Sequence, residues 1–250
     1  MKEKLNNKLI RICIIIVVIA TIIFGTGIII IRYQVEGETN LPFDISKITI
    51  ISSVEGKDNK DDVNKWNITV NQVNDVYFYI DKNNNYNKTE IIDNITIENI
   101  KVNKENEKGQ IHTYKPTEKG TNIFENNEEN IVDKIEYTGD LESNIKQLKI
   151  SNQGGIVVIR FSNDDISKFI SNDGEQVDHN KLLSLTKINQ DDIKTNVSFD
   201  FIIKLNSGKA YKANISLDLP AEDIIEKGTN SKEITDTKNI VFKRVENNLN

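Results

Sequence analysis

The most constraining feature of the sequence is an uncharged, apolar run at residues 12–31. A bilayer core of about 30 Å is crossed by about 20 helical residues, because each residue adds about 1.5 Å to a helix. Arg11 and Arg32 flank the run, and their long side chains can reach the membrane surface. The sequence therefore predicts a transmembrane signal anchor at 12–32.

The charges around this run predict its orientation. Four cations precede the run, opposed only by Glu3: Lys2, Lys4, Lys8 and Arg11. Positive flanks stay on the cytoplasmic side of a membrane. We therefore expect a single-pass protein of the cell membrane with a cytoplasmic tail at 1–11. A stalk at 33–44 and an extracellular domain at 45–250 would follow the anchor.

Two other interpretations of the run are less consistent with the residues. A cleaved signal peptide has an apolar region of about 7–15 residues before a site of small residues. Here four isoleucines, 28–31, follow the only small cluster, 25–27, so cleavage would leave an apolar new terminus. A lipoprotein is disfavoured because Cys13 lies at the start of the run rather than after it. We expect Cys13 to be an ordinary membrane residue.

Composition limits what the remaining 218 residues can be. Residues 33–250 contain 27 Lys and Arg against 37 Asp and Glu, and this acidic balance argues against a nucleic-acid partner. They contain no cysteine, so the domain must rely on its core alone, which a chain of this length can do. The chain has 28 Lys but only 4 Arg and is rich in Asn and Ile. These residues have AT-rich codons, so we expect a bacterial source, of the Gram-positive type.

Apolar alternation predicts strands for most of the domain. The chain has only 4 Ala, and Ile, Val, Thr, Tyr and Phe are plentiful. Apolar and polar residues alternate over 197–205 and again over 210–219, on either side of a turn that contains Gly208. This pattern is typical of an antiparallel hairpin with one buried face. Pro220 is expected to end it.

The other expected elements are shorter. A second hairpin is predicted over 66–81 with its turn within 72–75. Helices are predicted over 162–170, which opens like a capping box, and over 179–188. Hairpin loops are expected at 57–65 and 83–88, with a polar approach to the last strand at 225–238. Further strands are predicted at 46–53, 91–102, 110–115, 131–138, 146–151, 156–161 and 239–245.

About ten short strands separated by turns predict a mainly β fold, an antiparallel β-sandwich of two sheets with one or two short helices. The polar segment 116–130 is either a long loop or a linker. The extracellular domain is therefore one large sandwich or two immunoglobulin-like halves that divide within 116–130.

No catalytic or metal-binding motif stands out. The two histidines, His112 and His179, are far apart in sequence, and no nucleophile elbow accompanies them. Zinc is not expected without a close ligand pair. An EF-hand-like start at Asp81 fails at Tyr86, where Gly is required, and at Ile92, where Glu is required. We therefore predict no catalytic residue, no metal and no cofactor.

Two further patterns have simple structural explanations. Adjacent carboxylates occur in polar segments, and solvated turns account for them: 61–62, 164–165 and 191–192. The segment 153–155, which contains two glycines, precedes an apolar strand instead of a helix. It therefore indicates a tight turn and not a phosphate-binding loop.

Aromatic residues give the only hint of a ligand. Tyr77 and Tyr79 point away from the apolar face of their predicted strand, and Trp66 lies nearby in sequence. Such rings can stack on a sugar, although tyrosines of this kind are more often covered by a loop or a second sheet. Trp66, Tyr77 and Tyr79 are the candidate ligand-binding residues.

Several segments resemble a known group of proteins. Segments 33–43, 65–67, 74–80, 151–155 and 198–204 together resemble a family of uncharacterised single-pass proteins of low-GC Gram-positive bacteria. The resemblance spans most of the chain and implies the same anchored topology. It implies no activity and no site residues.

The sequence therefore predicts a non-catalytic, membrane-tethered module outside the cell that binds or assembles with a protein partner at the outer face. Two alternatives stay open. One is a cell-wall-directed hydrolase that uses loop carboxylates. The other is a module that binds cell-wall glycan through Trp66, Tyr77 and Tyr79.

Overall fold

The computed structural model describes residues 2–59, 64–103 and 108–245, with side chains from Arg11 onward. The chain divides into two compact units, Met1–Thr39 and Asn40–Asn250. The first unit contains the apolar helix α1 (Lys2–Glu36). The second unit contains both β-sheets and no division within 116–130.

Helix α1 is long and apolar enough to serve as a membrane anchor. Its apolar part, Arg11–Glu36, has 26 residues, and none of it is buried in the protein. The predicted N-terminal apolar helix is therefore confirmed. The helix continues into the predicted stalk as far as Glu36, where the Arg32 Nε donates a hydrogen bond of 2.6 Å to the Glu36 carboxylate.

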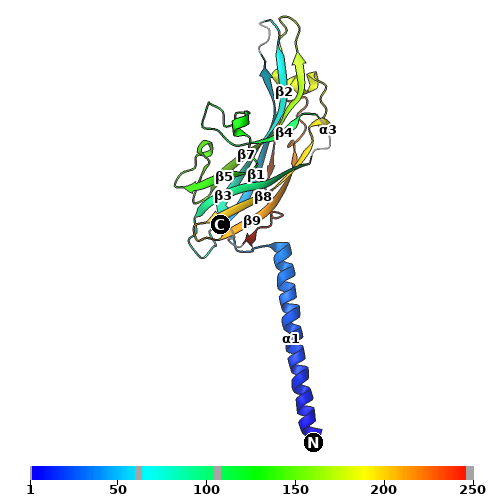
Figure 1. Cartoon of the computed structure of the whole chain (residues 1–250), viewed down its shortest axis with the longest axis vertical. Helices are drawn as coiled ribbons and strands as arrows, with labels where there is room; N and C mark the ends of the chain where they lie inside the picture. Colours follow the sequence, from blue (N-terminus) through cyan, green and yellow to red (C-terminus); the bar gives the residue numbers. More distant parts are fainter. Residues whose placement is uncertain (1, 60–63, 104–107, 246–250) are drawn as a thin grey trace. The chain divides into compact units, whose positions relative to one another are not determined.

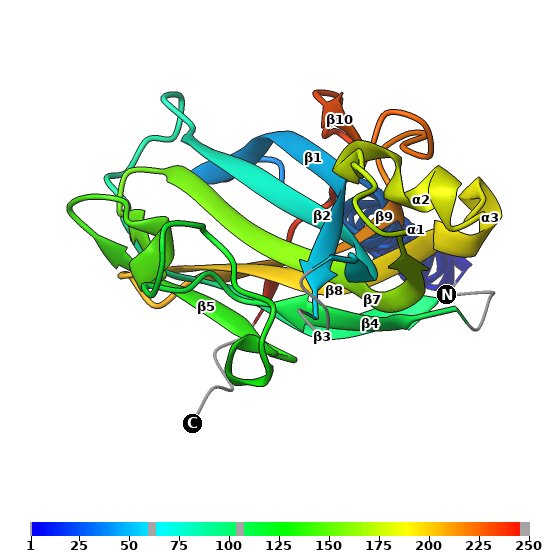
Figure 2. The ribbon, with the colours of Figure 1, turned by 90° about the horizontal axis from the view of Figure 1, so that it is seen from above.

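The second unit is a two-sheet sandwich, as predicted, and Figure 2 shows the sheets as two layers. The first sheet has the order β10-β1-β2-β7-β4, and the second has the order β11-β9-β8-β3-β5-β6. In the described part of the chain, the paired strands run antiparallel, except β5 and β6, which run parallel. The strands are β1 (Phe43–Asp58), β2 (Asn67–Lys82), β3 (Ile92–Asn103), β4 (Gln110–Tyr114), β5 (Ile135–Asp140), β6 (Lys149–Ser151), β7 (Gly155–Ile170), β8 (Thr195–Leu205), β9 (Ala210–Leu219), β10 (Thr229–Ile234) and β11 (Lys243–Val245).

Short helical turns connect some of the strands. They are η1 (Glu128–Asn130), η2 (Ile145–Gln147), η3 (His179–Lys181), α2 (Leu182–Leu185) and α3 (Gln190–Ile193). The predicted helix over 179–188 corresponds to η3 and α2. Asp178 caps it by accepting a hydrogen bond from the Asn180 backbone N–H. This is the usual role of Asp at a helix start.

The hairpin predicted at 197–219 is confirmed as β8 and β9. Buried and partly exposed residues alternate without a break along β8. Gly208 has a φ of 82° in the connecting turn, a left-handed conformation that glycine adopts at little cost. One face of this hairpin lies against the first sheet and supplies much of the core.

The main core fills the space between the two sheets. Its centre is aromatic: Phe78 and Phe161 from the first sheet meet Phe199 and Phe201 from the second. The hydroxyl of Tyr137, on β5, also bridges the layers, since it donates to the Val158 carbonyl at 2.7 Å. The sheets are therefore joined by packing and by at least one buried hydrogen bond.

A second core lies under the start of β2 and the end of β7. Here short helices, and not the second sheet, cover the first sheet (Figure 1). It contains Ile68, Val70, Ile166, Leu182, Leu183, Ile188, Ile193 and Ile224. A buried polar row separates the two cores. Ser52 and Gln72 both donate hydrogen bonds to the Asn74 side-chain oxygen, at 2.7 and 2.8 Å.

The predicted hairpin at 66–81 is wrong, because β2 runs through this segment as one strand. The polar residues Gln72 and Asn74 suggested a turn, yet both are buried and satisfy each other in the polar row. β2 pairs with β1 on one side and with β7 on the other. Tertiary hydrogen bonding therefore overrides the local turn signal.

The predicted helix at 162–170 is also wrong, because β7 extends to Ile170. The register against β2 shifts between Val70 and Gln72, and residues 164–166 form the bulge on β7. Asp165 has a φ of 55°, and its backbone N–H donates to the Asn71 side chain at 2.9 Å. Of the polar residues that resembled a helix cap, Ser162 and Asn163 pair with β2, and Asp164 and Asp165 belong to this bulge.

Other expectations are met in part. The remaining predicted strands overlap β1, β3, β4, β5, β6, β7 and β11, and the polar segment 225–238 contains the additional strand β10. Segment 83–88 joins strands of different sheets and so does not close a hairpin. Segment 153–155 is the expected turn, between β6 and β7. Within the predicted loop 57–65, residues 60–63 lie outside the described residues.

Candidate functional site

Three charged residues meet on the outer face of the first sheet. Asp75 on β2 and Arg160 on β7 are paired in register, so their side chains leave the sheet on the same side. Glu55 reaches them from β1. The alternation that sends Val76 and Ile159 into the core sends Asp75 and Arg160 to the opposite face.

The Arg160 side chain is only 9% exposed and is held on several sides. Its Nε and Nη2 donate to the two Asp75 oxygens at 2.6 and 3.0 Å. Its Nη1 lies 3.0 Å from both the Glu55 carboxylate and the Asn126 side-chain oxygen. The guanidinium carbon lies 4.7 Å from the centre of the Phe124 ring. Arg160 is therefore a fixed cation.

The charges in this cluster shift the pKa of Arg160 and of Glu55. Burial lowers the pKa of Arg160, but the hydrogen bonds and charges of Asp75 and Glu55 outweigh burial and raise it. Burial raises the pKa of Glu55, and the nearby charges of Asp75 and Asp164 raise it further against the opposing effect of Arg160. Glu55 is therefore a carboxylate whose negative charge is incompletely compensated.

A second branch of the network reaches the sheet edge. The Ser162 hydroxyl donates to Asp164 at 2.5 Å, and the other Asp164 oxygen contacts His112 at 2.8 Å and Tyr114 at 2.7 Å. Burial, then the hydrogen bond and charge of Asp164, raise the pKa of Tyr114. The carboxylate thus lies between serine and histidine, whereas nucleophilic catalysis needs the histidine next to the serine.

A hollow of about 850 Å³ opens over Arg160. We call it the Arg160 hollow. The loop between β4 and β5 forms one wall, since Ile123 and Phe124 pack against an apolar cluster with Tyr77, Tyr114 and Val158. Its charged lining residues are Glu55, Lys57, Asp75, Glu125 and Arg160, and its amides are Asn71, Asn122 and Asn126.

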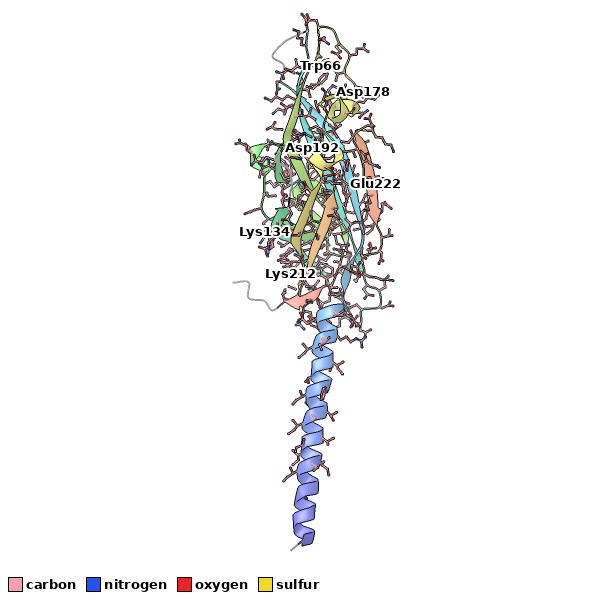
Figure 3. The ribbon with its side chains drawn as sticks, turned by 90° about the vertical axis from the view of Figure 1, so that its right-hand side faces the viewer. Trp66, Lys134, Asp178, Asp192, Lys212 and Glu222 are labelled. Atoms are coloured by element: carbon pink, nitrogen blue, oxygen red, sulfur yellow. The ribbon has the colours of Figure 1, made fainter. Side chains whose placement is uncertain are left out.

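The three predicted ligand-binding residues do not form one platform. Tyr77 is covered by the loop that carries Phe124, and Tyr79 lies under Lys47, with Nζ 4.2 Å from the ring centre. Trp66 lies thirteen residues before Tyr79, roughly 40 Å away along an extended chain. Figure 3 shows Trp66 at one end of the domain, near Asp178.

The Arg160 cluster was not predicted from the sequence, although one signal was present. Arg160 stands between Ile159 and Phe161 in an otherwise apolar strand of a chain with only 4 Arg. A buried arginine in such a strand requires carboxylate partners. The partners Asp75 and Glu55 come from two other strands, so only the strand order and register reveal them.

The carboxylate pairs differ where they are described. The pair 164–165 was predicted to be a solvated turn and is not, because it lies in the β7 bulge with Asp164 hydrogen-bonded to Ser162 and Tyr114. The pair 191–192 forms ion pairs with lysines. Asp191 pairs with Lys194 at 2.8 Å, and Asp192 pairs with Lys108 at 2.7 Å. The pair 61–62 lies outside the described residues. Among the described residues, no group of three or more His, Cys, Asp or Glu side chains is arranged to hold a metal ion.

Comparison with known proteins adds no family. No protein-family model, no curated protein and no solved structure matches the chain. The resemblance to single-pass proteins of low-GC Gram-positive bacteria stays a prediction.

Proposed function

We propose that this chain is a non-catalytic, membrane-tethered module whose β-sandwich lies outside the cell and binds a protein partner. The partner inserts a lysine or arginine side chain into the Arg160 hollow, next to Glu55. The observation that supports this proposal is the incompletely compensated carboxylate of Glu55 at the border of a preformed hollow.

The charge balance of the hollow favours a cationic group. Glu55 and Asp75 share the single guanidinium of Arg160, and Asp75 takes both of its bidentate hydrogen bonds. The Glu55 side chain is 42% exposed, so an incoming group can reach it. An ammonium or guanidinium group would stabilise the charged form of Glu55, whose pKa is raised without it.

A hydrolase is the second candidate. Glu55, a carboxyl group with a raised pKa, lies near the carboxylate of Asp75, and glycosidases use such a pair as general acid and as base or nucleophile. Asp75 weighs against it, since both of its oxygens accept hydrogen bonds from Arg160. Release of reducing ends from purified cell wall by the native chain, and not by Glu55→Gln, would replace the binding proposal with this one.

Crosslinking from the hollow tests the binding proposal. We expect a photo-reactive residue at Asn122, which lines the Arg160 hollow, to capture a defined protein in intact cells. The same residue at the exposed Lys232 on β10 should not capture it. Glu55→Gln should lower the yield of the adduct several-fold, because the ion pair is lost, while the control Glu233→Gln should not. Equal labelling from both positions, or no adduct, would contradict the proposal.

Thiol labelling tests the topology. In a Cys13→Ser background the chain has no cysteine. We expect Asp173→Cys, at an exposed position, to react with a membrane-impermeant maleimide in intact cells. Lys4→Cys should react only after the cells are permeabilised, because the positive flank stays inside. Labelling of Lys4→Cys in intact cells, or a trimmed chain in the culture medium, would contradict this topology.

A further inference from the structure

A second hollow, of about 620 Å³, lies at the end of the domain where β2 begins. We call it the tip hollow. It is formed by the end of β1, the residues before β2 and the loop after β7. Its polar, charged and aromatic lining residues are Asp58, Asn64, Lys65, Trp66, Asp173 and Glu175. None of them belongs to the Arg160 hollow.

The ring of Trp66 is held in place at this hollow and is 38% exposed. The His179 ring meets it edge to face, with centroids 5.6 Å apart and planes at 90°. The backbone of Trp66 is fixed by Ser171. The Ser171 Oγ accepts a hydrogen bond from the Trp66 N–H at 2.9 Å, and the Ser171 N–H donates one to the Trp66 carbonyl at 3.0 Å. The indole is therefore a preorganised surface, so little freedom is lost when a ligand binds.

The rim of the hollow is open at Gly174. Gly174 donates its backbone N–H to the Asn64 carbonyl at 3.1 Å, and a side chain added at Gly174 would meet no atom within 4 Å. Glu175 is held by two hydrogen bonds from Asn172, at 2.8 and 3.1 Å. An exposed aromatic surface with positioned polar groups around it suits a flat, hydroxylated ligand with one apolar face, which is a sugar ring.

The charges at the rim restrict which sugar fits. Among the described lining residues, three carboxylates, Asp58, Asp173 and Glu175, accompany one cation, Lys65, whose Nζ lies 3.5 Å from the Asp173 carboxylate. Acidic sugars and phosphate-bearing polymers would be repelled by this rim. We propose that the tip hollow binds a neutral or amino-sugar unit of a polysaccharide, stacked on Trp66.

The tip hollow lies far along β1 from the start of that strand. β1 starts at Phe43, a few residues after α1, and its 16 residues reach Asp58 at the hollow. At about 3.3 Å per residue, the hollow lies roughly 50 Å along the strand from that start. A binding site at this end is therefore well separated from the start of β1.

The chain contains a single tryptophan, so its fluorescence reports on this site alone. The full chain in detergent is titrated with three pentasaccharides: β-1,4-linked N-acetylglucosamine, β-1,4-linked glucose and, as the acidic control, galacturonate. We expect the tryptophan fluorescence to change and to saturate with at least one of the two neutral sugars at sugar concentrations below about 10 mM, a range that includes a millimolar dissociation constant. The acidic sugar should cause no change. No response to either neutral sugar, or an equal response to the acidic one, would overturn the proposal.

Variants separate stacking from folding. Calorimetry should show at least a tenfold loss of affinity for Trp66→Ala and a smaller loss for Trp66→Phe, which keeps a ring. Ile170→Ala is the matched control, because Ile170 is exposed on the neighbouring end of β7 and should bind as the native chain does. Equal affinity of Trp66→Ala and Ile170→Ala would overturn the proposal. Glu55→Gln should leave sugar binding unchanged, so failure of the Arg160 hollow and failure of the tip hollow are distinguishable.

Discussion

Replacing Arg160 with methionine is expected to lower the free energy of unfolding by about 3–5 kcal/mol, the range for breaking a buried ion pair. Methionine fills a similar volume but cannot donate hydrogen bonds. Asp75, whose side chain is only 16% exposed, would lose both of its charged donors. The cost arises from leaving a carboxylate largely buried without a cation.

The measurement is urea unfolding of the full chain in detergent, followed by the circular dichroism of the strands. Lys47→Met is the matched control, because the Lys47 pair with Glu233 lies at the surface and should contribute little. The double variant Arg160→Met with Asp75→Leu should recover most of the loss, since the buried carboxylate of Asp75 is then removed together with its cation. A double variant as unstable as Arg160→Met alone would show that packing on Phe124, and not charge, explains the effect.

The same cluster links stability to the proposed binding. Arg160 holds Asp75 on one side and stacks on Phe124 from the loop on the other. Asn126 of that loop accepts from Arg160 and donates to Ser162 at 3.0 Å. One arginine therefore fixes both the floor and the wall of the Arg160 hollow, and its loss should also abolish the crosslink from Asn122.

The parts of the fold that the sequence predicted are those in which local pattern and tertiary environment agree. β8 and β9 alternate because one face lies on the core and the other on water, so period-two hydrophobicity identifies them. The apolar helix α1 is recognisable because its composition alone meets the length that a membrane requires.

The errors occur where polar residues are buried. Gln72 and Asn74 have the composition of a turn, but they lie in a buried row between two cores and bond to each other and to Ser52. Ser162 and Asp164 resemble a helix start, but they are hydrogen-bonded on the outer face of β7. Local rules read these residues as turn or cap formers, because they do not show that the residues are buried between strands of the sheet.

The candidate site was hidden for the same reason. Trp66, Tyr77 and Tyr79 are close in sequence and would have been close in space if 66–81 were a hairpin. As one strand, β2 separates Trp66 from Tyr79 by roughly 40 Å and brings Asp75 to Arg160. The single error about the turn therefore placed Trp66 too close to Tyr77 and Tyr79.

Phe199→Ala is expected to destabilise the domain by about 3–5 kcal/mol, because it removes a fully buried ring from the junction of the two sheets. Its ring centre lies 5.8 Å from that of Phe78 and 6.1 Å from that of Phe161, both on the opposite sheet. A rigid sandwich cannot collapse around the cavity that the missing ring leaves. The described part of the second unit also contains no cysteine, so no disulfide offsets the lost stability.

For a domain of this size the loss corresponds to a fall in Tm of about 6–20 °C. Thermal unfolding of the full chain, followed by circular dichroism, measures it. Leu141→Ala is the control, because Leu141 is 83% exposed and should leave Tm nearly unchanged. A fall in Tm of less than about 2 °C for Phe199→Ala would mean that the two sheets are not held together by this aromatic centre. The stability would then have to come from the second core and the polar row, in which case Asn74→Ala would become the more damaging change.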